Sequence, residues 1–185
     1  MTLSSRLKKM LIGRAFSNVD GRIRMFGKMD WLLFPARALA LNFQSIGEKL
    51  GTDYLYKIGY EAGYDAGKEI IAATGAKLKG GWATQKIVTG LLDFIGFGNV
   101  GFIKSDFNKK GQHHFIIHVY GNPVIEHSVK LFGKKSMVCY WFRGVYSAHG
   151  NLELGLENCN FKENKCIKDG SPYCEWESKW EWKDK

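Results

Sequence analysis

Apolar residues recur every three or four positions through the first half of the chain, which is the period of an amphipathic helix. Gly51 and Gly75 follow the last apolar residues of two such segments, and glycine is common just beyond a helix end. Thr52 and Asp53 can cap the second segment, and Pro35 stands in the first turn or two of the first. The pattern predicts three helices, from Trp31 to about Leu50, from Thr52 to Gly75 and from Trp82 to Ile95.

The second helix carries a stripe of three glycines, Gly59, Gly63 and Gly67. Each glycine in a helix interior costs about 1 kcal/mol relative to alanine, so another interaction must compensate. Residues four apart lie on one helix face, and a face without side chains lets another backbone or a ligand come close. Close packing against a second helix is the favoured interpretation, and the wall of a ligand site is the alternative.

The apolar period shortens to two after a glycine-rich segment at residues 96–101. This segment precedes a strand and lacks the Lys-Ser/Thr ending of a phosphate-binding loop, so we interpret it as a helix-to-strand turn. Residues 100–107 and 113–120 are rich in Val, Ile and Phe, and the loop 108–111 joins them. They predict a β-hairpin.

Beyond the hairpin the pattern predicts one more helix between strands. A third strand is expected at residues 124–132, a helix capped by Ser136 and ending near Gly150, and a strand at residues 152–161. From Cys174 onward apolar and charged residues alternate, which is typical of a strand with one wet face. Helices followed by a mostly antiparallel sheet with one inserted helix predict an α+β fold.

The 185 residues, 45% of them hydrophobic, suit one globular domain. The best apolar run is shorter than the roughly 18 residues that a membrane-spanning helix needs. The net charge is +9, but residues 1–28 supply +6 of it and leave +3 for residues 29–185. We therefore expect a basic arm at residues 1–28 and one domain at residues 29–185. A body so close to neutral does not predict a nucleic-acid partner.

The basic arm has apolar residues at helical spacing after Ser4 and Ser5. A short basic amphipathic helix can dock on the domain or make a peripheral contact with an anionic membrane, and both interpretations stay open. Arg14 interrupts the apolar stretch that an export signal would need, so we expect a cytoplasmic location. The apolar residues of this stretch are Leu3, Leu7, Met10 and Leu11.

All the cysteines lie in the last quarter of the chain, at Cys139, Cys159, Cys166 and Cys174. In a reducing compartment, clustered cysteines are more often metal ligands or reactive groups than disulfide partners. The turn-forming residues 168–172 fold Cys166 and Cys174 toward each other, and Cys139 can join them from a separate element. With Glu163 they offer three sulfurs and one oxygen, which zinc accepts tetrahedrally. Packing as small buried hydrophobes is the competing interpretation.

Histidines and tryptophans suggest weaker alternatives. His113, His114 and His118 fall on one predicted strand and allow a second metal site, against the simpler interpretation of a polar strand face. Trp176 and Trp180 alternate onto the inward face of the last strand, so core packing is favoured over stacking on nucleic-acid bases.

Three motifs in the last fifty residues carry a family resemblance. They are Cys139-Tyr-Trp-Phe-Arg-Gly144, Glu163-x-x-Cys166 and Gly170-x-x-x-Cys174-Glu-Trp. Together they resemble the C-terminal half of the 4-vinyl-reductase domain family, which includes the sensor domains of aromatic-responsive bacterial activators, and a weaker likeness extends back to about residue 25. The resemblance implies the fold of trafficking-complex subunits and nitric-oxide-sensing haem domains, with helices leaning on a sheet over an apolar pocket.

The resemblance also implies a structural zinc beside that pocket, held by Cys139, Glu163, Cys166 and Cys174. Glu157 or Cys159 are alternative ligands if the strand register shifts; otherwise Cys159 is expected to be a packed thiol. Four protein ligands would leave zinc no position for an activated water, which argues against zinc hydrolysis.

The leading hypothesis is a ligand-binding sensor domain that holds a small hydrophobic or aromatic molecule and acts through a protein partner or a homodimer. The helix from Trp31 to Leu50 is the expected dimer seam. The expected ligand-binding residues are Gly59, Gly63, Gly67, Trp141 and Tyr146.

Two other hypotheses remain. The family name suggests a reductase or accessory factor for tetrapyrrole-like substrates, although the chain has no nicotinamide or flavin fingerprint. The third hypothesis is a trafficking or assembly subunit without a free ligand.

Overall fold

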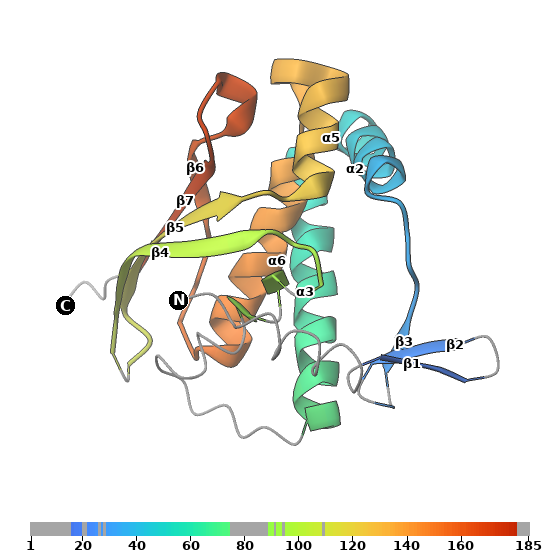
Figure 1. The fold of residues 1–185 in the computed structure, drawn as a ribbon. Helices are drawn as coiled ribbons and strands as arrows, with labels where there is room; N and C mark the ends of the chain where they lie inside the picture. The colour runs from blue at the N-terminus through green and yellow to red at the C-terminus, as the bar shows by residue number, and fades with distance from the viewer. Residues whose placement is uncertain are drawn as a thin grey trace.

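The change of apolar period near residue 98 coincides with the change from helix to sheet in the folded chain. The structure is a computed structural model. It describes residues 16–19, 22–25, 27, 29–74, 89–90, 92–93, 95–108 and 110–180. Figure 1 shows long helices on one side of a four-stranded antiparallel sheet, with two helices inserted between its second and third strands along the chain. The predicted α+β class is confirmed.

The helices of the described residues are α2 (Ala36–Leu50), α3 (Thr52–Thr74), α5 (Pro123–Phe132) and α6 (Val138–Glu153), with the short 3₁₀ helices η1 (Gly133–Lys135) and η2 (Ile167–Asp169). The main sheet has the order β4-β5-β7-β6, with strands β4 (Asn99–Phe107), β5 (His113–Tyr120), β7 (Cys174–Trp180) and β6 (Lys162–Lys165). None of the helices in this part of the chain combines the length and apolar character that crossing a bilayer requires.

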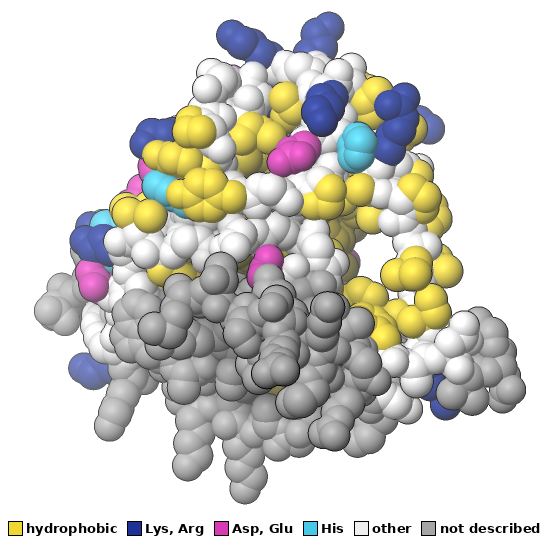
Figure 2. All heavy atoms as spheres, in the orientation of Figure 1, with side chains coloured by type: hydrophobic (Ala, Val, Ile, Leu, Met, Phe, Trp, Pro, Cys, Tyr) yellow, Lys and Arg dark blue, Asp and Glu magenta, His cyan; other side chains and the backbone are white. Residues whose placement is uncertain are grey.

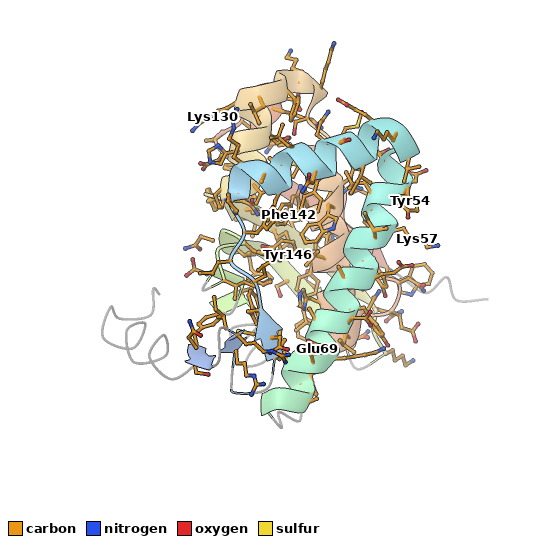
Figure 3. All side chains as sticks on the ribbon, turned by 90° about the vertical axis from the view of Figure 1, so that its right-hand side faces the viewer. Tyr54, Lys57, Glu69, Lys130, Phe142 and Tyr146 are labelled. Carbon is orange, nitrogen blue, oxygen red and sulfur yellow. The ribbon has the colours of Figure 1, made fainter. Side chains whose placement is uncertain are left out.

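Helix α6 lies between the sheet and α3 (Figures 1 and 3). On the sheet side, the buried residues Phe115 and Ile117 of β5 and Trp176 of β7 belong to one apolar core with Phe142 of α6. Phe115 and Ile117 alternate with less buried residues along β5, so they share the inward face of this strand. Burial of these large side chains anchors α6 against the sheet.

On its other side, α6 meets α3 through backbone rather than side chains. A Cβ atom on Gly59 would lie closer than 3.0 Å to the carbonyl oxygen of Trp141, and one on Gly63 would lie 2.8 Å from the Cα of Val145. Gly144 of α6 makes the reciprocal approach to the backbone of Tyr56. The predicted close packing of the glycine stripe against a helix is therefore confirmed at Gly59 and Gly63, and the contact compensates for the low helix propensity of glycine.

The first long helix begins later than the apolar spacing predicted, at Ala36 rather than Trp31. Trp31 instead ends β3 (Met29–Trp31), which forms a small antiparallel sheet with β1 (Phe16–Val19) and β2 (Arg22–Met25). Pro35 explains the difference, because a proline disfavours helical geometry in the residue before it but is tolerated where a helix starts.

The predicted strand at residues 124–132 is wrong, because this segment forms helix α5. The side-chain oxygen of Asn122 accepts hydrogen bonds from the backbone N–H groups of Val124 and Ile125 at 3.0 Å each, and Pro123 occupies the first helical position. A cap followed by proline is a helix-start signal that outweighs the β-branched residues of the segment.

The predicted strand at residues 152–161 is also wrong. Helix α6 continues to Glu153, and the chain then runs without regular structure to β6. Gly155 and Asn158 have positive φ angles of 67° and 49°, which interrupt extended backbone. The side chain of Asn151 also accepts a hydrogen bond from the backbone N–H of Cys159 at 2.7 Å. Ser136 does not cap α6 with its side chain, because its hydroxyl group pairs with that of Ser128 at 2.7 Å.

The remaining predictions are only partly covered by the described residues. The hairpin of β4 and β5 is confirmed, as is the last strand through Trp180. Of the helix predicted at residues 82–95, residues 89–90 and 92–93 are helical and most of the rest lies outside the described residues. The helix expected around Leu3 to Leu11 in the basic arm also lies outside them.

The α3–α6 contact predicts the effect of a single methyl group. An alanine in a helix interior is normally about 1 kcal/mol better than glycine, but Gly59→Ala would press its Cβ into the α6 backbone. We expect this variant to lower the free energy of unfolding by about 2 kcal/mol, measured by urea denaturation. In the control Gly101→Ala, the new Cβ meets nothing closer than 3.5 Å, and we expect a change below about 1 kcal/mol. Equal stability of the two variants would contradict the close approach.

Candidate functional site

Three cysteine sulfurs meet in the core where α6 packs against the sheet. The Sγ atoms of Cys139 and Cys166 are 3.4 Å apart, those of Cys166 and Cys174 3.4 Å, and those of Cys139 and Cys174 3.8 Å. All three residues are buried and their thiols are free, far from the roughly 2.05 Å of a disulfide bond. Two sulfurs bound tetrahedrally to one zinc at about 2.3 Å would be about 3.8 Å apart. The cluster therefore has the dimensions of one face of a thiolate metal site.

Three separate elements carry these sulfurs. Cys139 is the second residue of α6, Cys166 lies between β6 and η2, and Cys174 begins β7. The backbone carbonyl of Cys166 accepts hydrogen bonds from the backbone N–H groups of Asp169 at 3.0 Å and Ser171 at 3.4 Å. These bonds close the predicted turn between Cys166 and Cys174. The prediction that Cys139 joins this pair from a separate element is confirmed.

The start of α6 is held in place by a buried glutamine of α2. The side chain of Gln44, 1% exposed, accepts a hydrogen bond from the Met137 backbone N–H at 2.9 Å and donates one to the Lys135 carbonyl at 3.0 Å. Because Met137 precedes α6 and offers no side-chain cap, this amide satisfies a helix-end N–H. Cys139 follows two residues later, so α2 positions the first sulfur of the cluster.

The cluster favours negative charge on one sulfur. Hydrogen bonds from the thiols of Cys139 and Cys174 hold the pKa of Cys166 well below its usual range, at about 3. The pKa of Cys139 is raised, first because its thiol donates to Cys166 and also because it is buried. A metal ion would displace the remaining thiol protons, because thiolates rather than thiols bind metals.

Glu163 lies next to the cluster but is not part of it. Among the described residues, only the three cysteines place their ligand atoms all within 4.8 Å of one another. The Glu163 carboxylate binds the Lys168 ammonium through Oε1 at 2.7 Å, while its buried Oε2 has no hydrogen-bond partner among the described residues. Burial raises the pKa of Glu163 against the opposing effect of that ion pair. A buried oxygen without a partner is costly, and a nearby cation would satisfy it.

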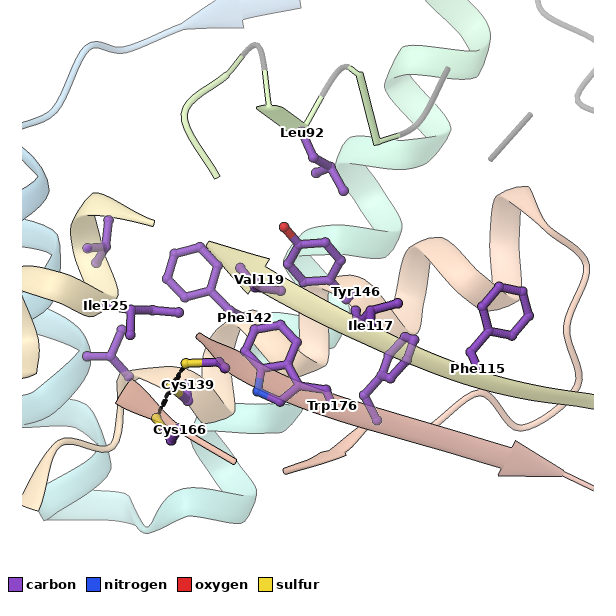
Figure 4. Close-up of a cluster of buried hydrophobic side chains, with 14 of the residues drawn as sticks. Leu92, Phe115, Ile117, Val119, Ile125, Cys139, Phe142, Tyr146, Cys166 and Trp176 are labelled. Atoms are coloured by element: carbon purple, nitrogen blue, oxygen red, sulfur yellow. Dashed lines mark hydrogen bonds between the residues drawn. The ribbon is translucent and has the colours of Figure 1, made fainter. Parts of the chain in front are cut away.

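A second buried polar atom without a partner lies beside the sulfurs. Trp176 follows Cys174 by two residues on β7, and the burial pattern of this strand puts both side chains on the inward face of the sheet. Figure 4 shows Trp176 in the core with Cys139 and Cys166. Trp176 is fully buried, yet its indole Nε1 has no hydrogen-bond partner in the part of the chain that the structure describes. An N–H group can donate to a metal-bound thiolate, as groups around metal ligands commonly do.

The other candidate ligands lie outside the cluster. Cys159 is buried, and burial raises the pKa of its thiol to about 12. Glu157 is exposed in the loop after α6. Neither belongs to the group of converging ligand atoms.

A cavity of about 190 Å³ lies on the α3 side of α6. Its described walls come from α3, from α6, from the segment at residues 92–97 and from Trp31 of β3. Trp141 borders it and stacks on Phe43 at a ring distance of 4.4 Å, and Phe97 meets the same indole edge-on at 6.0 Å. The described lining is Trp31, Ala62, Gly63, Ala66, Ile70, Leu92, Ile95, Phe97, Trp141, Val145 and His149. Such an aromatic and aliphatic lining suits an apolar ligand.

A smaller cavity of about 30 Å³ lies on the sheet side of α6. Tyr146 borders it, and its hydroxyl group donates a hydrogen bond to the Phe97 carbonyl at 3.3 Å. Asn122 also donates to this carbonyl, at 2.8 Å, so the turn before β4 is held from two sides. The described lining is Thr89, Leu92, Val100, Phe102, Phe115, Ile117, Tyr146, His149, Gly150, Leu154, Leu156 and Phe161.

Three of the five predicted ligand-binding residues line one of the two cavities. Gly63 and Trp141 line the larger cavity and Tyr146 the smaller one. Gly59 and Gly67 are buried in α3 but are not among the described lining residues of either cavity. Their role in ligand binding stays a prediction.

Sequence reasoning missed the cavity residues Phe97 and His149, and it missed Gln44, whose side chain holds the start of α6. Phe97 and His149 come from a turn and from the far end of α6, and no spacing in the sequence joins them. The Asn122-Pro123 pair, by contrast, is a readable helix-start signal that would have placed α5.

His114 and His118 lie on the outer face of the sheet, whereas His113 shares the inward face with Phe115 and Ile117, and none of the three belongs to a metal cluster among the described residues. His114 and His118 each bond a β7 carboxylate at 2.7 Å, Glu177 and Glu175 respectively. His113 is buried and bonds Ser178 at 2.8 Å. The simpler interpretation, a polar strand face, fits the contacts of His114 and His118.

An apolar stretch is exposed between β3 and α2. Leu32 is 77% exposed, Leu33 75% and Phe34 48%. We call these three residues the connector. Figure 2 shows hydrophobic side chains along this side of the molecule, where the connector stands away from the body. Consecutive exposed apolar residues are unusual on a monomeric protein and typical of an interaction surface.

Comparison with known proteins identifies the fold. No protein-family profile and no curated protein matches the chain. The chain is similar in structure to the phenol-responsive sensory domain of the transcription activator PoxR, solved with phenol, with a TM-score of 0.69, 17% identity, and coverage of 97% of this chain and 91% of that one. It is also similar to a trafficking protein particle complex subunit 3 from Naegleria fowleri covalently bound to palmitic acid, with a TM-score of 0.55, 16% identity, and coverage of 81% and 98%.

These two likenesses confirm the related fold that the sequence motifs predicted. At such low identity they show the fold alone, and membership of the 4-vinyl-reductase family stays a prediction. The chain has the α+β fold shared by a small-molecule sensory domain and a subunit of a trafficking complex.

Proposed function

We propose that this chain is a sensor domain that binds a small apolar or aromatic molecule in the larger cavity, on a scaffold braced by zinc. The observation that carries the proposal is the cavity itself, lined by Trp141, Phe97 and aliphatic side chains. An apolar cavity of about 150 Å³ can bind benzene, so about 190 Å³ has room for one substituted ring. The similarity in fold to a phenol-responsive domain supports this choice of ligand class.

The zinc part of the proposal rests on the donor set. Three buried sulfurs 3.4–3.8 Å apart match a thiolate site, and soft sulfur ligands favour zinc over calcium or magnesium. The partnerless Oε2 of Glu163 makes this residue the proposed fourth ligand. With four protein ligands, zinc would serve as a structural brace between α6 and the sheet.

Ligand binding can reach a partner through the small N-terminal sheet. Trp31 of β3 lines the larger cavity, and the connector follows it directly in the chain. A ligand that displaces the Trp31 ring would therefore change how Leu32 and Leu33 are presented. We propose a second copy of the chain as the partner on this surface, extending the predicted seam from α2 into the connector.

The trafficking or assembly hypothesis is the second candidate. It is favoured by the exposed connector and by the likeness to a trafficking-complex subunit. In that case the cavity would serve packing or a bound acyl chain rather than signalling. The reductase hypothesis and a membrane contact of the basic arm stay predictions, and residues 1–15 of that arm lie outside the described residues.

We expect the purified chain to hold about one zinc ion, as a closed structural site does. Cys166→Ser and Cys174→Ser should each lose the metal and unfold at lower temperature, because binding energy at such a site is folding energy. Metal analysis by mass spectrometry and thermal unfolding measure both effects. Cys159→Ser is the matched control, since its buried thiol lies outside the cluster. Full zinc content in all three variants would show that the cluster is not the site.

The fourth ligand can be tested separately. Glu163→Gln keeps the size of the side chain but removes its charge, so we expect weaker zinc binding in competition with a chelator. Unchanged zinc affinity would show that Glu163 is not a ligand and that the three cysteine sulfurs bind the metal without it.

A bulky side chain in the larger cavity should block ligand binding. Ala66 and Ala72 are both exposed residues of α3, but Ala66 lines this cavity and Ala72 does not. We expect Ala66→Trp to abolish binding of toluene and phenol in calorimetric titrations, and Ala72→Trp to leave it unchanged. Equal binding by both variants would place the ligand elsewhere.

A charge on the connector should separate a dimer. We expect Leu33→Glu to convert dimers to monomers in sedimentation experiments, because a buried unpaired carboxylate is costly at an interface. Ile103→Glu introduces the same charge on β4, at a side chain that is 58% exposed, and should leave the dimer intact. If the unaltered chain is itself monomeric at high concentration, the self-association proposal fails.

A further inference from the structure

The two cavities are bordered by two residues in common, Leu92 and His149. Leu92 comes from the helical residues before β4, and His149 comes from the last part of α6. Figure 4 shows the Leu92 side chain pointing toward Tyr146, which borders the smaller cavity. The larger and the smaller cavity are therefore adjacent, and Leu92 and His149 lie between them.

We propose that the cavities are two compartments of one ligand chamber divided by Leu92, and that the chain selects aromatic molecules with an alkyl extension. This inference rests on the proposed function and names its ligand class. The ring would occupy the larger compartment, and the extension would pass Leu92 into the smaller one.

The volumes support this division. About 190 Å³ accommodates a single ring, whereas about 30 Å³ holds no more than a group the size of a water molecule. The smaller compartment can therefore receive an alkyl extension only when Leu92 changes rotamer and the extension takes the space that its side chain vacates. Leu92 is 2% exposed and sits in the short segment between the helical and sheet halves, where a leucine side chain has alternative staggered positions.

The chemistry of the walls defines the extension. Val100, Ile117 and Leu156 are among the hydrocarbon side chains of the smaller compartment, and its Tyr146 hydroxyl already bonds the Phe97 carbonyl. A polar extension would lose its hydration among these hydrocarbon side chains, and the polar residues of the described lining are limited to Thr89, Tyr146 and His149. An alkyl chain would instead gain affinity, about fourfold for each methylene group buried.

The test compares toluene with n-butylbenzene by calorimetric titration. For the unaltered chain we expect n-butylbenzene to bind at least tenfold more tightly than toluene. Leu92→Ala opens the division and should widen that ratio. Leu154→Trp fills the smaller compartment, which Leu154 lines, and should remove the advantage of n-butylbenzene while toluene affinity stays within about twofold.

The outcomes separate this inference from the proposed function. If toluene binds and n-butylbenzene binds no better, the two-compartment chamber is overturned and the sensor proposal stands. If neither molecule binds to the unaltered chain, both fail. Because the two substitutions act in opposite directions, a variant that does not fold still leaves the other as a test, with thermal unfolding identifying the folded one.

Discussion

The contact between the backbones of α3 and α6 is the constraint on which the rest of the structure depends. Gly59 and Gly63 on one helix, with Gly144 on the other, remove the side chains that would hold the helices apart. The close approach places α6 so that different faces of one helix serve different purposes. Cys139 at its start reaches the sulfur cluster, while Trp141 and Tyr146 border cavities on opposite sides. A shift of α6 would therefore disturb the metal site and the cavities together.

The sulfur cluster complements this contact from the sheet side. Three cysteines meet in the core, and the lowered pKa of one of them, Cys166, favours a negative charge where charge is costly. Within the described residues, one oxygen of Glu163 and the indole N–H of Trp176 are also buried without hydrogen-bond partners. A divalent cation would account for these features at once, by neutralising the sulfurs and giving the carboxylate a partner. It would also tie α6 to β7, which the apolar core alone holds by packing.

The N-terminal segment links the interior to the surface. The small sheet of β1, β2 and β3 contributes Trp31 to the cavity wall, and the chain then leaves the body through the exposed connector. Arg22 and Arg24 pair with Asp30 across this sheet at 3.7 Å and 3.4 Å. Two arginines of the basic arm are therefore paired with a carboxylate of the neighbouring strand. A ring in the cavity and a partner on the connector would thus act on neighbouring residues, which is a short route for a signal.

The sequence alone determined most of the segments that bury a face, and it identified the cysteines that are candidates for metal binding. Apolar periodicity identified α3, the β4–β5 hairpin and β7, and cysteine spacing identified the metal candidates, because both signals are local. It misjudged α5 and the residues after α6, where the cap at Asn122 and the left-handed Gly155 and Asn158 outweighed β-branched composition. Only the tertiary structure decided that Cys139 meets Cys166 and Cys174, that Gln44 holds the start of α6, and that Leu92 and His149 border both cavities. These contacts join residues 27 to 93 positions apart, and their geometry depends on how helices and sheet pack rather than on any local preference.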